Sequence, residues 1–194
     1  MTSTPASLLD RLQKASSDSP DWLKLHDLYL PLIKFWLARI AGTRDESDDL
    51  AQEVLVVLVR ELPNFEPRGK GSFRAWLRQI TVNKTRAHFK RRRNRPLAGL
   101  AGGEDDFLSQ LEDPESELAR EWDRDHDRHV SQKLLELVKN DFEPTTWAAF
   151  CRFALEGTPA AKVAVELGIS ENAVLLAKSR VLKRLRREAG DFLT

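Results

Sequence analysis

The sequence has 194 residues, of which 41% are hydrophobic and 31% charged, a balance that excludes an intrinsically disordered chain. Its single cysteine, Cys151, excludes an internal disulfide and favours a reducing compartment. The formal net charge of +1 hides a basic block at 68–95, a mainly acidic block at 104–127 and a second basic block at 178–187. This segregation predicts two surfaces that bind a polyanion and a segment between them that shields or avoids them. Without a signal peptide or a bilayer-length apolar run, we expect a cytoplasmic protein.

The first half of the chain has helical periodicity. A helix is expected to start at Ser19, a candidate N-cap, and to end near Gly42, with Pro31 kinking or splitting it. The next apolar run, 54–59, has the composition of a buried strand. Acidic residues before it and the sequence "REL" after it favour a helix over 48–62.

After the loop "PNFEPRGKG", a third helix is expected over 72–93. Its basic residues are interleaved with aromatic ones, a combination that holds the backbone and stacks the bases of single-stranded nucleic acid. The competing interpretation, core packing, is expected to hold for at least one of Phe73 and Trp76. The "KRRRNR" run has its own alternative, a solvated helix end.

The segment 97–114 is rich in Gly, Pro and acidic residues and is expected to be a flexible linker. We therefore predict an all-α fold of two small helical domains, 1–96 and 115–194, joined by this acidic linker. In the second domain, Gly168 is expected to form a tight turn and Ser170 to cap the helix that follows. With Ala161, Ala164, Val165 and Leu167 on the apolar side of the preceding helix, this pattern predicts a helix-turn-helix. An ordinary helical hairpin with a basic end is the alternative.

These parts, in this order, resemble a bacterial RNA polymerase sigma factor. "DDLAQEVLVVLVRELPNF", "GSFRAWLRQITVNKTRAHFKRRR", an acidic linker and a helix-turn-helix are similar to the extracytoplasmic-function (ECF) group of the sigma-70 family. The resemblance covers residues 22 to 187 and implies that 1–96 is sigma domain 2 and that 115–194 is sigma domain 4. It implies a monomer, without cofactor, that binds core RNA polymerase and promoter DNA. An anti-sigma factor is a further candidate partner.

The resemblance also implies roles for individual residues. The polar positions of the family's D-x-x-Q-E pattern bind core polymerase, and here they are Asp49, Gln52 and Glu53. The loop and the basic helix bind the minus-ten element, where a base is flipped and the strands are melted. The matching residues are Arg68, Lys70, Ser72, Trp76, Asn83, Lys84, Arg86, Lys90, Arg91, Arg92 and Arg93.

In the second domain the resemblance assigns the minus-thirty-five element to the exposed face of the helix at 171–187. The matching positions are Asn172, Leu175, Leu176, Ser179, Arg180, Lys183 and Arg184. Leu175 and Leu176 depart from the polar or basic residues that are common there. They either contact thymine methyl groups or pack inside, in which case Arg180 carries most of the base readout.

Other functions share some of these sequence features. A conventional helix-turn-helix regulator would bind duplex DNA by itself as a dimer, and an RNA-binding adaptor would use the aromatic and basic block alone. "RGKGS" lacks the residues of a phosphate-binding loop, and no nucleophile with a base stands out, so we do not expect an enzyme. His126 and His129 share a helix face without a third ligand, so we expect no metal site. The acidic residues Glu104, Asp105, Asp106, Glu112 and Asp113 are hypothesised to reduce DNA binding by the free protein.

Overall fold

The structure, a computed structural model, describes residues 7–16, 19–40, 43–69, 71–93 and 104–192. Within these ranges the regular secondary structure is helical, which confirms the all-α prediction. The α-helices are α1 (Leu8–Gln13), α2 (Asp21–Arg39), α3 (Ser47–Glu61), α4 (Ser72–Arg93), α5 (Glu104–Glu112), α6 (Glu117–Lys139), α7 (Pro144–Phe150), α8 (Ala160–Leu167) and α9 (Glu171–Ala189). Short 3-10 turns lie at Arg44–Glu46, Leu62–Asn64 and Gly190–Phe192, and a π-helical turn lies at Cys151–Leu155. No described helix combines the length and the apolar character that a bilayer-spanning segment requires.

The chain divides into two compact units. The first unit consists chiefly of residues 8–130 and the second chiefly of residues 131–190. Helix α6 contributes its residues up to Val130 to the first unit and the remainder to the second. This division differs from the expected boundaries at 96 and 115, because the first compact unit continues through α5 and into α6.

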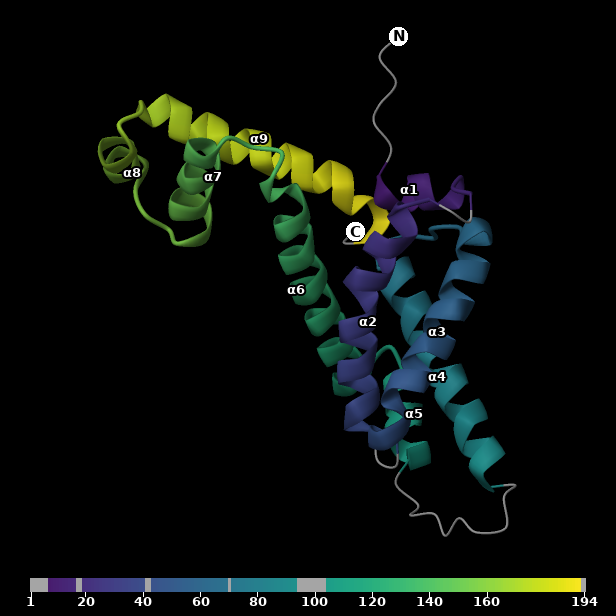
Figure 1. The fold of residues 1–194 in the computed structure, drawn as a ribbon. Coiled ribbons are helices and arrows are strands. Elements are labelled where there is room, and N and C mark those ends of the chain that lie inside the picture. The colour runs from purple at the N-terminus through teal and green to yellow at the C-terminus, as the bar shows by residue number, and fades with distance from the viewer. Residues whose placement is uncertain (1–6, 17–18, 41–42, 70, 94–103, 193–194) are drawn as a thin grey trace. The chain divides into compact units, whose positions relative to one another are not determined.

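In the first unit, α2, α3 and α4 lie side by side, as Figure 1 shows. Helix α2 continues through Pro31 without a break and begins at Asp21, whose backbone N–H donates to Ser19 Oγ at 3.3 Å. The N-cap residue is Pro20 and not the predicted Ser19, which lies one residue before it. Helix α3 includes the ambiguous run 54–59, which confirms the choice of helix over strand. The shared core consists mainly of Leu25, Leu28, Ile33, Trp36, Leu37, Leu50, Ala51, Val54, Leu58, Phe73, Leu77 and Phe89.

The prediction of a flexible linker was wrong for the residues of α5. Leu108 and Leu111 are fully buried, and α5 packs against α4. The Glu112 carboxylate accepts a hydrogen bond from Gln79 at 3.0 Å and pairs with Arg86 at 2.6 Å. Leu108 and Leu111 are three residues apart and lie on one side of α5, which therefore has a buried apolar side despite its acidic composition. Residues 97–103 of the expected linker lie outside the described ranges.

The first half of α6 is tied to α2 and α4 by aromatic and charged contacts. The rings of Trp36 and Trp122 lie 5.1 Å apart, and both side chains are fully buried. Arg78 is buried and donates to the Asp123 carboxylate and to the backbone of Ala119, at 3.2 and 3.3 Å. Burial lowers the pKa of Arg78, although the charge of Asp123 opposes this shift. Arg78 therefore has a structural role that its place in a basic block did not suggest.

His126 on α6 is buried and held in one orientation. Its Nδ1 lies 3.1 Å from a carboxylate oxygen of Asp127, and its Nε2 lies 3.3 Å from the Tyr29 hydroxyl. Because Nδ1 faces a carboxylate, it carries the proton and Nε2 accepts from the tyrosine. Burial lowers the pKa of His126, against the opposing effect of Asp127. Its neighbour His129 has Nε2 2.6 Å from the backbone oxygen of Leu28, so both histidines have protein partners.

The lowered pKa of His126 predicts acid sensitivity between neutral pH and about pH 5.5. In this pH range the unfolded chain binds a proton that the folded chain excludes. The free energy of unfolding therefore decreases as the pH is lowered, by at most about 1.4 kcal/mol per pH unit. The loss begins at the unfolded pKa and is complete below the folded one. In thermal melts at pH 7.5 and 5.5, His126→Gln is expected to lower Tm at pH 7.5 but to show a smaller pH effect than the wild type. Equal pH effects in the two proteins would exclude His126 as the cause.

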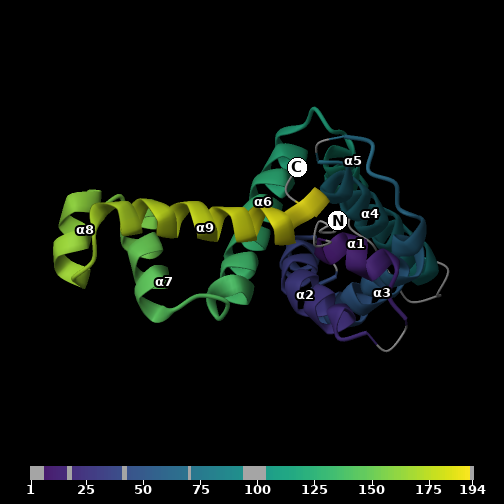
Figure 2. The ribbon, with the colours of Figure 1, turned by 90° about the horizontal axis from the view of Figure 1, so that it is seen from above.

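In the second unit, α7 and α8 both pack against α9, as Figure 2 shows. Gly168 ends α8 with φ +64°, and Ser170 Oγ accepts a hydrogen bond from the backbone N–H of Ala173 at 3.1 Å. Both features of the predicted turn are thus confirmed. The apolar side of α8 differs from the expected one, because Val163 is buried and Val165 is exposed. The common core consists of Ala149, Val163, Ala164, Val174 and Ala177.

Candidate functional site

The outer side of α3 is a mixed polar and apolar surface. Asp49 and Gln52 are exposed, and so are Val56 and Val59, with 63% and 39% of their surface accessible. These four side chains, called here the α3 face, recur at helical spacing opposite the buried Leu50. Exposed valines beside an acid and an amide form a surface suited to docking another protein. The two valines belong to this surface although the sequence pattern singled out only the polar residues.

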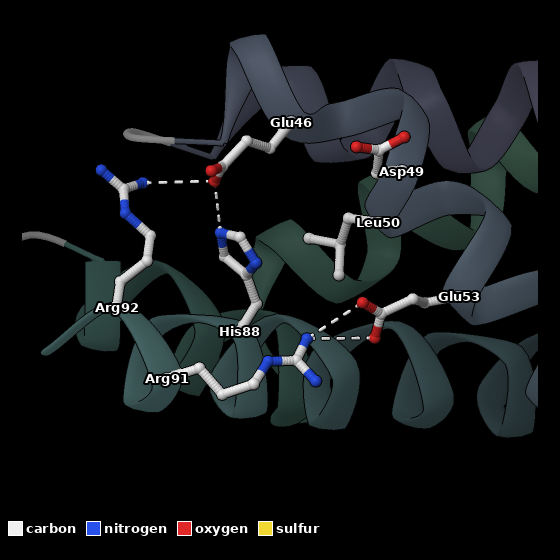
Figure 3. Close-up of a pocket in the computed structure, with 7 residues that line it drawn as sticks. All are labelled: Glu46, Asp49, Leu50, Glu53, His88, Arg91 and Arg92. Carbon is white, nitrogen blue, oxygen red and sulfur yellow. Dashed lines mark hydrogen bonds and ion pairs between the residues drawn. The ribbon is translucent and has the colours of Figure 1, made fainter. Parts of the chain in front are cut away.

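Glu53, at the edge of the α3 face, is engaged by basic residues of α4. Its carboxylate oxygens accept hydrogen bonds from Arg91 Nη2 at 3.0 and 3.1 Å, and Lys84 Nζ lies 3.6 Å away, as Figure 3 shows for the arginine. Burial opposes ionisation of Glu53, but the bond to Arg91 and the charges of Arg91 and Lys84 outweigh it and lower its pKa. A predicted polymerase-binding acid is therefore paired with two predicted DNA-binding cations.

A second ion-pair group lies beside it. Glu46, in the turn before α3, has its carboxylate 2.6 Å from His88 Nε2 and 3.7 Å from Arg92 Nη1. In Figure 3 both side chains reach up from α4 to this one carboxylate, while Asp49 points away from the pairs. The predicted phosphate contact Arg92 thus has an acidic neighbour in this structure.

An aromatic hollow opens where the loop after α3 meets the start of α4. The rings of Phe65 and Trp76 are stacked with centroids 4.6 Å apart, and Phe73 lies edge-on beneath both. Phe73 is fully buried, which places it in the core, whereas Trp76 is half-buried. The hollow has a volume of about 390 Å³ and is lined by Asn64, Phe65, Glu66, Arg68, Ser72 and Trp76. The structure therefore brings the predicted residues Arg68, Ser72 and Trp76 together around one concave surface.

Further along α4 the predicted residues differ in how accessible they are. Asn83 and Lys90 are exposed, and Asn83 accepts a hydrogen bond from Gln79 at 3.2 Å. Arg86 is half-buried and paired with Glu112 of α5. Lys70 and the side chain of Arg93 lie outside the described parts of the structure.

The contact between Glu112 and Arg86 gives a test of shielding by the acidic segment. Surface ion pairs contribute about 0.5 kcal/mol, so Glu112→Gln is expected to raise the affinity of the isolated protein for a single-stranded oligonucleotide about twofold at low salt. The measurement is a fluorescence anisotropy titration without polymerase. Glu115→Gln removes the same charge near α5 and is the control, because Glu115 pairs with Arg120 at 3.5 Å and not with α4. Equal affinities of the two variants would contradict shielding at Arg86.

In the second unit, α9 presents a surface of polar, basic and apolar side chains. The predicted residues Asn172, Leu175, Leu176, Ser179, Arg180 and Lys183 are all exposed, and are called here the α9 face. The opposite side of the helix buries Val174, Ala177 and Val181. The predicted residue Arg184 is held instead by Asp141 at 2.7 Å and by Glu188 at 2.6 Å. Its contact with a phosphate would need these pairs to open.

Two residues of α7 lie next to the α9 face, although nothing in their sequence indicates it. Thr145 and Thr146, in the first turn of α7, line a hollow of about 240 Å³ together with Leu176 and Arg180. The apolar residues of α7 indicate only that one side of this short helix packs in the core. They do not indicate that its first turn lies beside α9. Only the packing of α7 on α9 brings the two threonines there.

Comparison with known proteins identifies relatives of both units. A family model for sigma-70 region 2 matches residues 25–95. The chain is 30% identical over 151 residues to the probable RNA polymerase sigma factor RfaY of Xanthomonas campestris, a match that covers 77% of this chain and 36% of that protein. It is 26% identical over 174 residues to the ECF RNA polymerase sigma factor SigE of Mycolicibacterium smegmatis, covering 90% of this chain and 62% of the relative.

A third relative is the RNA polymerase sigma-H factor of Pseudomonas aeruginosa, 31% identical over 121 residues, which cover 59% of this chain and 61% of that protein. The chain thus spans between 36% and 62% of the length of these curated relatives. The match to region 2 includes α3, α4 and the aromatic hollow.

Proposed function

Because the chain is an ECF-type member of the sigma-70 family, we propose that it binds core RNA polymerase and directs it to a specific class of promoters. The observation that carries this proposal is the arrangement of the first unit. The exposed α3 face and an aromatic, basic surface on α4 belong to one compact body, within the segment that matches region 2. The catalytic groups for RNA synthesis belong to the polymerase, and this chain supplies promoter recognition in the cytoplasm.

The α3 face binds the polymerase in this proposal. Its exposed valines supply apolar area, and Asp49 and Gln52 supply polar contacts that fix the register of docking. The polymerase surface that receives it is cationic and partly apolar, since it must complement an acid and two valines. Glu53 contributes less to docking because its carboxylate is already paired with Arg91.

The hollow and the α4 surface bind the melted minus-ten element. A base leaving the duplex loses stacking worth a few kcal/mol, and an aromatic platform offsets this loss. Trp76 on Phe65 provides such a platform, while Arg68 at the rim and Lys90 on α4 provide cations for the phosphates.

The second unit binds the minus-thirty-five element through the α9 face. Exposed side chains on the second helix of a helix-turn-helix reach base edges in the major groove, while lysine and arginine at its margin hold phosphates. In this proposal the second unit, chiefly 131–190, serves as sigma domain 4, and the first unit, chiefly 8–130, serves as domain 2 extended through α5 and part of α6.

A complex-formation experiment tests the proposal. Purified chain is mixed with core polymerase and run on size-exclusion chromatography, and the complex is compared with the chain alone for binding to genomic promoter fragments. We expect a stoichiometric complex of one chain per core enzyme, and specific DNA binding by the complex only. An isolated dimer that binds a palindromic duplex tightly would instead support the regulator alternative.

A further inference from the structure

Two adjacent leucines lie exposed in the α9 face. Leu175 and Leu176 have 50% and 44% of their surface accessible, whereas Val174 and Ala177 on either side of them are buried. Asn172 and Ser179 therefore lie at the centre of the exposed side of α9, and the two leucines lie on either side of this centre. The core of the unit is complete without them, so their apolar surface is available to a ligand.

Leu176 also forms one wall of the hollow between α7 and α9. The hollow is lined by the apolar residues Ala149, Ile169, Ala173, Leu176 and Ala177, together with Arg180, Thr145 and Thr146. Its volume of about 240 Å³ leaves room for a small apolar group beside a cationic, bidentate hydrogen-bond donor.

The charges around the leucines select the kind of partner. After Glu171, the exposed charged residues of α9 are all basic, and they are Lys178, Arg180, Lys183, Arg186 and Arg187. A polyanion is the complementary partner of such a margin. Double-stranded DNA combines phosphates with one apolar group on the base edges of its major groove, the C5 methyl of thymine, and offers guanine O6 and N7 as the acceptors that arginine prefers.

We propose that Leu175 and Leu176 read thymine methyl groups in the minus-thirty-five element and that Arg180 reads a guanine near the thymine bound by Leu176. This inference rests on the proposed function and specifies the bases that its second unit selects. Leu176 and Arg180 are four residues apart, about 6 Å along the helix axis. Since base pairs are spaced by about 3.4 Å, the two side chains contact base pairs no more than two steps apart.

The test replaces thymine by uracil, which removes the methyl group and keeps every base-pairing atom. Duplexes are first selected by the complex of chain and core polymerase from a library randomised over the minus-thirty-five element, and are then rebuilt with deoxyuridine. Losing one methyl contact weakens binding about fourfold, so wild-type affinity should fall by this factor for each thymine contacted. Deoxyuridine in the spacer, outside both elements, should leave the affinity unchanged.

Alanine variants test whether the leucines cause the loss of affinity for the uracil duplex. Leu175→Ala with Leu176→Ala should bind the thymine duplex about as weakly as wild type binds the uracil duplex, and should not distinguish the two. Leu155→Ala removes the same side chain from a residue that is 57% exposed in the π-helical turn, and should behave as wild type. Circular dichroism of the double variant checks that α9 is retained.

The outcomes separate this inference from the function on which it rests. A complex that selects a defined minus-thirty-five element but binds its uracil and thymine forms equally would overturn the leucine readout and leave the proposed function intact. A complex that selects no element at all would overturn both.

Discussion

Asp49→Ala and Val56→Asp are each expected to weaken binding of the chain to core RNA polymerase about tenfold or more. Val56 is the most exposed apolar residue of the α3 face, and a carboxylate there would be buried without a partner when polymerase docks. Asp49 is exposed and points away from the ion pairs with α4, so its carboxylate is available to the polymerase. A tenfold change corresponds to about 1.4 kcal/mol, which is more than the truncation of most interface residues costs.

The control for these variants is Asp45→Ala, which removes an exposed acid from the turn just before α3 without altering the α3 face. Titration of labelled chain with core polymerase gives the dissociation constants. Glu53→Ala is expected to have a smaller effect on polymerase affinity, because Glu53 is paired within the chain. Unchanged affinities for Asp49→Ala and Val56→Asp would show that another surface docks the polymerase.

Trp76→Ala is expected to reduce formation of the open promoter complex about tenfold or more while leaving polymerase affinity unchanged. Stacking of one base on an aromatic ring is worth about 1–3 kcal/mol, and the alanine variant loses the outer ring of the Phe65–Trp76 platform. Trp76→Phe keeps a ring at this position and should retain most of the activity. Permanganate footprinting of unpaired thymines measures the open complex directly.

A pre-melted template distinguishes a role in DNA binding from damage to the fold. If Trp76 acts by holding unstacked bases, a mismatched bubble at the minus-ten element should restore part of the activity of Trp76→Ala. Loss of polymerase binding, or of activity equally on duplex and bubble templates, would indicate that the variant disturbs the packing of Phe65 and Phe73 instead.

The regular parts of the fold could be predicted from local signals. Acidic residues at the start of α3 and "REL" at its end outweighed its β-branched run, and the positive φ of Gly168 with the cap by Ser170 followed from residue type alone. These signals involve residues that are only a few positions apart in the chain, so they can be recognised from the sequence alone.

The extent of the first unit could not be predicted in this way. In α5 the apolar residues Leu108 and Leu111 are few, and the surrounding acids suggested a solvated segment. Buried apolar contacts of α5 and α6 act together with ion pairs to α4 through Arg86, Arg74 and Arg78. Such pairing depends on which helices are neighbours in the fold. The order of charged residues along the sequence does not contain this information.

The same limit applies to the candidate site. The pattern identified the polar residues of the α3 face and the α9 face, but it did not reveal that Glu53 pairs with Arg91 or that Arg184 pairs with Asp141. It also left open whether Leu175 and Leu176 pack inside, and both are exposed. Surface accessibility and ion pairing emerge only when the helices are placed together.

Run-off transcription with purified core polymerase tests whether the chain directs initiation at specific promoters. Core enzyme, the chain, or both are incubated with genomic fragments and nucleotides, and the 5′ ends of the RNAs are mapped. We expect defined start sites, each preceded by two separated sequence elements, only when core enzyme and chain are both present. The same transcripts from core enzyme with and without the chain would contradict this expectation.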